Sequence, residues 1–157
     1  MLRVQPKSWW SEVYRVSEDG REVTEVNIRW MREAGTFAIG PDRFQVGREG
    51  WMSGDFYVAR GGTRLASASK PSALYRRFEV RVQGQSYTLA PRSAFTRTFD
   101  LARGGHSVGS VRPEAWWSRK ATAHLPEDLP LEVRVFLVWL VLVMWKRSRD
   151  SAASSGG

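Results

Sequence analysis

A chain of 157 residues can bury the core of one domain of ordinary size, and a second independent domain is not expected. The absence of cysteine excludes disulfides, thiolate nucleophiles and thiolate metal sites. The formal net charge of +8 favours an anionic partner, with a codon bias toward Arg as the alternative explanation of the charge. The first residues lack the apolar stretch of a secretory signal, so we expect a cytoplasmic protein, peripheral to the membrane if its ligand is a lipid.

Three stretches of the sequence repeat one another, and each is typical of a β-hairpin. Residues 56–77 match residues 99–120 without a gap, so that Ala59–Gly62 recurs as Ala102–Gly105. Residues 13–30 form a weaker third copy. In every copy, alternating apolar residues flank a turn, which lies at Asp19-Gly20, at Gly61-Gly62 and at Gly104-Gly105.

Other short runs of alternating or β-branched residues end at Gly or Pro and predict further strands. These strands are expected at Thr36–Ile39, Arg43–Val46, Phe78–Val82, Tyr87–Leu89 and Lys120–His124. Ten to twelve short strands at regular spacing predict a mainly β fold, either a sandwich or a closed barrel.

One segment near the C-terminus breaks this pattern. Val135–Trp145 is apolar without interruption, which is too long for an ordinary strand and shorter than the roughly 20 residues of a bilayer span. We predict a helix from Leu129 to Arg147, with Asp128 as its N-cap and Pro130 in its first turn.

A helix that is apolar on every side must be surrounded by protein or by lipid. Glu132 and Arg134 lie within the predicted helix, so a membrane span would have to start at Val135 and would be too short, which favours a buried core helix. A tail-anchored membrane protein is the alternative. We therefore expect a single domain over residues 1–147, followed by a disordered tail over residues 148–157.

Hairpin units built around a Gly pair and followed by one apolar helix resemble the tubby C-terminal-like superfamily, which includes the phospholipid scramblases and the LURP-one-related proteins. The resemblance is carried by VARGGTRLASAS, LARGGHSVGSV and VFLVWLVLVMW. It implies an antiparallel β-barrel of about twelve strands with the C-terminal helix threaded through its centre. The resemblance also implies lipids as candidate ligands.

The most suggestive catalytic motif is Gly105-His106-Ser107-Val108-Gly109, a G-x-S-x-G sequence of the kind found in esterases. That chemistry requires the serine on a sharp turn between a strand and a helix, whereas Ser107 falls within a predicted hairpin. We interpret the motif as a chance match and expect no enzyme activity. With only His106 and His124 as histidines, no metal site or cofactor is expected either.

Two basic pairs occupy equivalent positions in the repeats and follow aromatic residues. They are Arg76-Arg77, after Tyr75, and Arg119-Lys120, after Trp116-Trp117. Arginine beside an aromatic ring can hold a phosphate while the ring lies at a membrane interface. The alternative is that the rings plug the ends of the barrel while the cations extend to water.

The leading hypothesis is therefore a non-enzymatic module that binds an anionic ligand, most plausibly phospholipid headgroups at a membrane surface, through Arg76, Arg77, Arg119 and Lys120. The alternative is a structural or protein-interaction barrel with no small ligand. Nucleic acid ranks lower because the sequence contains neither an RNP-like aromatic motif nor a basic helix.

Overall fold

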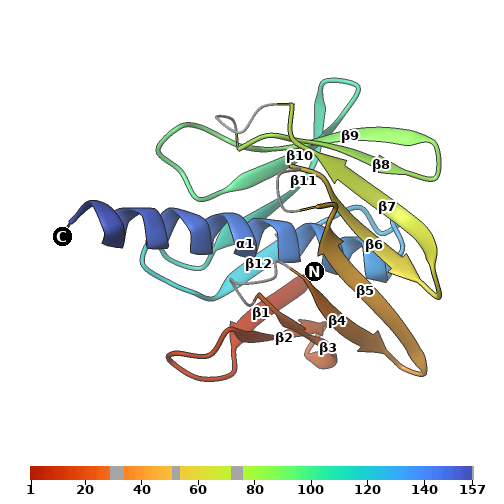
Figure 1. Ribbon diagram of the computed structural model, residues 1–157, viewed down its shortest axis with the longest axis horizontal. Helices are drawn as coiled ribbons and strands as arrows, with labels where there is room; N and C mark the ends of the chain where they lie inside the picture. The colour runs from red at the N-terminus through yellow and green to blue at the C-terminus, as the bar shows by residue number, and fades with distance from the viewer. Residues whose placement is uncertain (29–33, 51–53, 72–75, 157) are drawn as a thin grey trace.

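A computed structural model describes residues 1–28, 34–50, 54–71 and 76–156 of the chain, and its described residues form twelve strands and one helix (Figure 1). The strands are β1 (Leu2–Pro6), β2 (Val13–Glu18), β3 (Arg21–Asn27), β4 (Gly35–Ile39), β5 (Asp42–Arg48), β6 (Phe56–Arg60), β7 (Thr63–Ser69), β8 (Phe78–Val82), β9 (Gln85–Pro91), β10 (Phe99–Arg103), β11 (His106–Pro113) and β12 (Ala121–His124). The helix α1 covers Leu131–Ser155.

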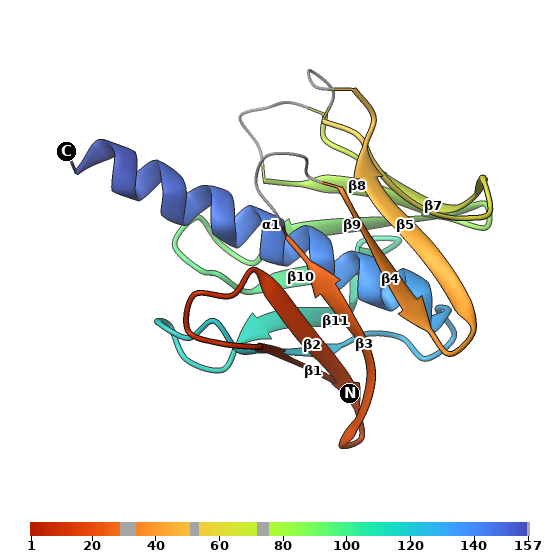
Figure 2. The same ribbon diagram turned by 60° about the horizontal axis from the view of Figure 1, so that its bottom comes forward.

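All strands belong to one antiparallel sheet, in the order β3-β2-β1-β12-β11-β10-β9-β8-β7-β6-β5-β4. The sheet curls around α1 until β3 and β4 come side by side, which gives a nearly closed barrel (Figures 1 and 2). Curling into a barrel buries one face of every strand against a common interior. The prediction of a twelve-stranded barrel with a central helix is confirmed, and the sandwich alternative is wrong.

The internal repeat corresponds to the hairpins β2–β3, β6–β7 and β10–β11. In β10–β11 the two turn residues, Gly104 and Gly105, both have positive φ angles, of 57° and 80°. Such a turn matches the right-handed twist of the flanking strands, and it explains the Gly pair. Each of the three hairpins also has a β-bulge at the same place in its second strand, where one residue has no partner in the first strand: Val23 of β3, Leu65 of β7 and Val108 of β11.

The barrel has two unlike ends. Tight turns such as Gly104-Gly105 lie at one end, which we call the turn end. Longer connections lie at the other, the loop end, and the structure describes three of them throughout: β1–β2, β9–β10 and β11–β12. The C-terminal part of α1 emerges from the loop end (Figure 1).

The helix begins two residues later and ends eight residues later than expected. Its N-cap is Pro130 and makes no side-chain capping bond, so the prediction of Asp128 as the cap is wrong. Its C-terminal part runs through Ser155, so the prediction of a disordered tail requires correction: residues 148–155 are helical and mostly exposed. Ser151, Ser154 and Ser155 each donate a side-chain hydrogen bond to the carbonyl four residues earlier.

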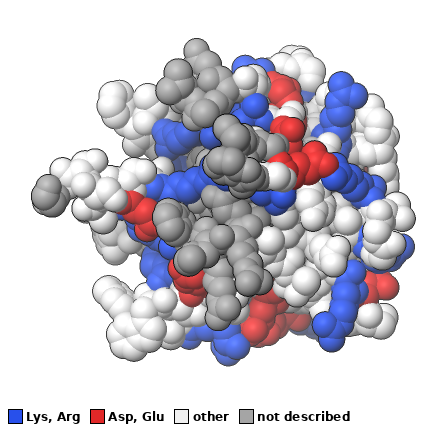
Figure 3. Space-filling view, viewed as in Figure 1, with Lys and Arg blue, Asp and Glu red and all other residues white. Residues whose placement is uncertain are grey.

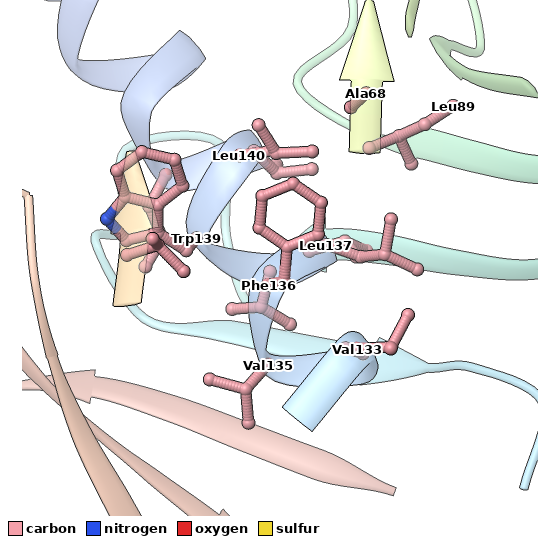
Figure 4. Packing of buried hydrophobic residues seen from close by; sticks show 14 of the residues in the cluster. Ala68, Leu89, Val133, Val135, Phe136, Leu137, Trp139 and Leu140 are labelled. Carbon is pink, nitrogen blue, oxygen red and sulfur yellow. The ribbon is translucent and has the colours of Figure 1, made fainter. Parts of the chain in front are cut away.

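Every residue of α1 from Val133 to Trp145 is buried inside the barrel. The strands surround this segment on all sides, so it needs no polar face. Trp139 is fully buried in the core (Figure 4). It packs edge-on against Phe56 of β6 at 5.8 Å between ring centroids. Its indole N–H donates a 2.9 Å hydrogen bond to the carbonyl of Asn27, at the end of β3. Within the described residues, the helix contains no stretch both long and apolar enough to cross a membrane.

A buried ion pair fixes the helix at the turn end. Arg134 contacts Glu18 of β2 at 2.5 Å and donates a second hydrogen bond of 3.1 Å to the carbonyl of Leu129. A buried cation is tolerated when it is paired and hydrogen-bonded in this way. The polar residue that argued against a membrane span thus marks the point where α1 enters the barrel.

Gly109 of β11 lies where the chain leaves no room for a side chain. A Cβ atom there would approach the carbonyl oxygen of His124 to 2.5 Å. Because that oxygen belongs to the backbone, we expect Gly109→Ala to lower the free energy of unfolding by about 1–3 kcal/mol, the usual cost of overpacking. Urea denaturation followed by circular dichroism measures this change. Ser107→Ala, at an exposed site of the same strand, is the control, and an equal loss in both variants would contradict the prediction.

Candidate functional site

Large aromatic side chains are exposed together on three connections of the loop end. Trp9 and Trp10 lie between β1 and β2, Phe95 between β9 and β10, and Trp116 and Trp117 between β11 and β12, with exposed fractions from 70% to 100%. The rings of Trp116 and Trp117 project away from the core, so the interpretation that aromatic rings plug the barrel is wrong for this pair. A cluster of exposed aromatic residues of this size usually marks an interaction surface.

The three connections share one sequence pattern. Each connection follows a proline at the end of a strand. The second residue after the proline is small, the fourth is aromatic and the fifth carries a hydroxyl group. The three sequences are Pro6-Lys-Ser-Trp-Trp-Ser, Pro91-Arg-Ser-Ala-Phe-Thr and Pro113-Glu-Ala-Trp-Trp-Ser. We call residues 7–12, 92–97 and 114–119 the aromatic loops.

The aromatic loops also share one backbone conformation. In each, the hydroxyl residue donates its backbone N–H to the carbonyl three residues earlier. Its side-chain oxygen also accepts a hydrogen bond from the backbone N–H two residues later. The hydroxyl residues of the three loops are Ser11, Thr96 and Ser118. Such local turns leave the aromatic residue at the tip, directed to solvent. The hydrogen bonds within each loop therefore hold the aromatic rings in their exposed positions.

Arginine side chains join neighbouring loops to one another. Arg97 of the second aromatic loop donates to the carbonyls of Trp116 and Ser118 of the third, at 2.9 and 2.8 Å. Arg119 of the third loop donates to the corresponding carbonyls, of Trp9 and Ser11, in the first. Because β9–β12, β1 and β2 are adjacent in the sheet, the three loops form a continuous row. Hydrogen bonds from a charged donor to carbonyls fix this row more firmly than neutral ones would.

The residues predicted to bind an anion lie at the loop end, but in two separate places. Arg76 donates a 3.0 Å hydrogen bond to the carbonyl of Ala94, which continues the pattern of contacts between loops. Arg77 is exposed and pairs with Glu79 at 2.9 Å. Strands β9 and β10 separate this pair from Arg119 and Lys120.

Arg119 and Lys120, which form the second basic pair, have different surroundings. Arg119 lies over the ring of Tyr14 at 5.3 Å and also donates hydrogen bonds to that hydroxyl, at 3.2 and 3.1 Å. It therefore positions the loops. Lys120 is exposed, and its ammonium group has no hydrogen bond or ion pair with another residue that the structure describes. Tyr75, which precedes Arg76, lies outside the described residues.

Further cations gather where α1 leaves the barrel. Arg97 stacks on the ring of Trp145 at 4.4 Å, and the indole N–H of Trp145 donates to the carbonyl of Arg97 at 2.8 Å. Burial lowers the pKa of Arg97, and the positive charge of Arg149 lowers it further. Burial also acts to lower the pKa of Lys146, but its hydrogen bonds to Glu12 and Asp150 outweigh burial and raise it. In Figure 3, blue atoms lie beside the base of the emerging helix on the side shown, with red atoms among them.

The G-x-S-x-G sequence has a structural role within its hairpin. Gly105 forms the tight turn together with Gly104, and Gly109 lies close to the backbone carbonyl of His124 at the end of β12. Ser107 is exposed on β11, where it pairs with Ala102, so it lies on a strand and not on a strand-to-helix turn. Among the described residues, no group of three or more His, Asp or Glu side chains could hold a metal ion.

Comparison of this chain with family models, with curated proteins and with solved structures finds no match. The resemblance to the tubby-like superfamily thus remains a prediction.

Sequence reasoning missed Trp9, Trp10 and Phe95 as companions of the Trp116-Trp117 pair. The signal was present, because all three loops place an aromatic residue four positions after a proline. It also missed Arg97 and Arg149, whose proximity depends on the path of the helix. Their separation in the sequence gives no sign of that proximity.

Proposed function

We propose that the chain is a non-enzymatic module that binds an anionic membrane surface with the loop end of its barrel. The observation that carries the proposal is the row of three aromatic loops, with its five exposed aromatic rings and the basic residues beside them. Tryptophan favours the interface between water and lipid, where its ring and its N–H are both satisfied. Arginine and lysine are attracted to acidic headgroups at the same depth.

The arrangement of the loops supports a flat and extended target. The three aromatic loops are neighbours, so their rings can meet one surface together. Figure 2 shows the three loops on one side of the emerging helix, so that a surface contacting them need not meet the end of the helix directly. Arg149 lines a cleft together with Trp10 and Arg119, so the helix adds positive charge beside the loops that attracts acidic headgroups.

Flotation of the full chain with lipid vesicles tests the proposal. We expect the chain to float with vesicles that contain phosphatidylserine and to remain in solution with purely zwitterionic vesicles. Each basic residue near an acidic surface contributes about 1 kcal/mol, and salt screens this attraction. Binding should therefore weaken as the salt concentration rises. No flotation with acidic vesicles at low salt would contradict the proposal, and equal flotation with both kinds would contradict its electrostatic part.

A further inference from the structure

A positively charged cleft opens where α1 leaves the barrel, between the helix and the first and third aromatic loops. Its volume is about 210 Å³, and it is lined by Trp10, Glu12, Ile28, Arg119, Lys146 and Arg149. Among the lining residues that the structure describes, three cations from two parts of the fold thus face one carboxylate. The cleft has several times the roughly 30 Å³ share of one water molecule, so it has room for an oxyanion.

Arg149 supplies unused hydrogen-bond donors to this cleft. Its side chain is exposed, and it makes no hydrogen bond or ion pair with the other residues that the structure describes. Arg149 lies close enough to the half-buried guanidinium of Arg97, a like charge, to lower the pKa of Arg97. Two neighbouring cations repel each other, and an anion bound between them would relieve this repulsion. The pair therefore favours the binding of an anion.

The other two cations are held in position by the protein. Arg119 uses Nε, one N–H of Nη1 and both N–H groups of Nη2 on Tyr14, Trp9 and Ser11, which leaves one of its five donors. Lys146 contacts Glu12 at 3.0 Å and Asp150 at 3.3 Å, which leaves one of its three. Their charges are therefore fixed at the cleft, and each keeps a donor for a ligand.

We propose that this cleft binds one phosphate group. A phosphate carries several strong acceptor oxygens that point in different directions, which matches cations arriving from the helix and from a loop. A carboxylate has two acceptors in one plane and would engage fewer of them. The inference rests on the proposed function for the source of the phosphate, a lipid headgroup, while a soluble phosphate compound would use the same contacts.

Titration of the full chain with inorganic phosphate, followed by backbone amide NMR signals, tests the cleft. We expect saturable shifts confined to residues around Glu12, Arg119 and Lys146. Arg149→Gln should weaken binding about fivefold to tenfold, because a charged donor is lost. Glu12→Gln should tighten binding, because it removes the carboxylate of the cleft and frees Lys146. Arg81→Gln is the matched control, since Arg81 is exposed on β8 away from the cleft, and it should leave the affinity unchanged.

The outcomes separate the cleft from the membrane proposal. Shifts that do not saturate, or an equal loss in the Arg81 and Arg149 variants, would overturn the cleft, even if the chain still floats with acidic vesicles. Saturable phosphate binding without flotation would support the cleft as a site for a soluble phosphate compound and overturn the proposed function. Weaker flotation of the Arg149 variant, with unchanged flotation of the Arg81 variant, would support a lipid headgroup as the source.

Discussion

Replacement of Trp9, Trp10, Trp116 and Trp117 together by serine is expected to abolish flotation with acidic vesicles and to leave the unfolding midpoint unchanged. These rings contribute little to the core because they are at least 70% exposed. If each recovers only about 1 kcal/mol on entering the interface, below the usual value for full burial, the four together account for about 4 kcal/mol. That loss corresponds to a decrease in affinity of roughly a thousandfold. Flotation and thermal denaturation of the same variant measure the two quantities.

The corresponding variant with four phenylalanines is the control, and it should retain most of the binding. Phenylalanine keeps the apolar ring and loses only the indole N–H, so it still enters the interface. The serine variant also keeps all basic residues, which separates the contribution of the rings from that of charge. Flotation of the serine variant as strong as that of the original chain would contradict the role of the aromatic loops.

The hairpins could be predicted from the sequence because their turns require particular backbone angles. Gly104-Gly105 and its repeats satisfy that requirement at regular spacing. Strand β1 was missed because its Leu2 and Val4 give only a brief alternation beside the N-terminus. Its formation depends on pairing with β2 and β12, which join it into the closed sheet. Such long-range pairing leaves no local signal.

The end of the helix was misjudged for a different reason. Small residues such as those of Ser151–Ser155 are common in disordered tails, but no Gly or Pro stands between Pro130 and Gly156 to end the helix earlier. The buried part of α1 provides a formed helix that these residues extend, so the cost of nucleation is already met. The contact between Lys146 and Asp150, one turn apart, gives further local support.

The site was predicted in part. The equivalence of Arg76 and Arg119 in the repeat was visible, and both donate to the carbonyl of a neighbouring loop. What the sequence could not give is that the acceptor lies in another loop, since the partners of Arg119 are more than 100 residues away. Closure of the barrel brings them together. The basic residue after the aromatic pair Trp116-Trp117 therefore lies in an aromatic loop, and its contacts give it a positioning role.

The second large effect is expected from Trp139→Ala in the centre of the barrel. The side chain is fully buried and contacts Phe56 and Phe136. Loss of such a core aromatic residue costs about 3–5 kcal/mol, because the strands around it cannot collapse into the cavity. The variant also loses the 2.9 Å hydrogen bond to the carbonyl of Asn27, near the line where β3 and β4 meet. Since a domain of this size has about 5–15 kcal/mol in total, a large share of its stability should disappear.

Urea denaturation followed by far-ultraviolet circular dichroism measures this loss, with Trp116→Ala as the matched control. The same chemical change at Trp116, which is 81% exposed, should alter the free energy of unfolding by no more than about 0.5 kcal/mol. Trp139→Phe should fall between the two, because it keeps most of the packing and loses the indole hydrogen bond. If Trp139→Ala cost no more than Trp116→Ala, the apolar segment of α1 would not be the core of the barrel. The strands would then have to bury their inward faces against some other element.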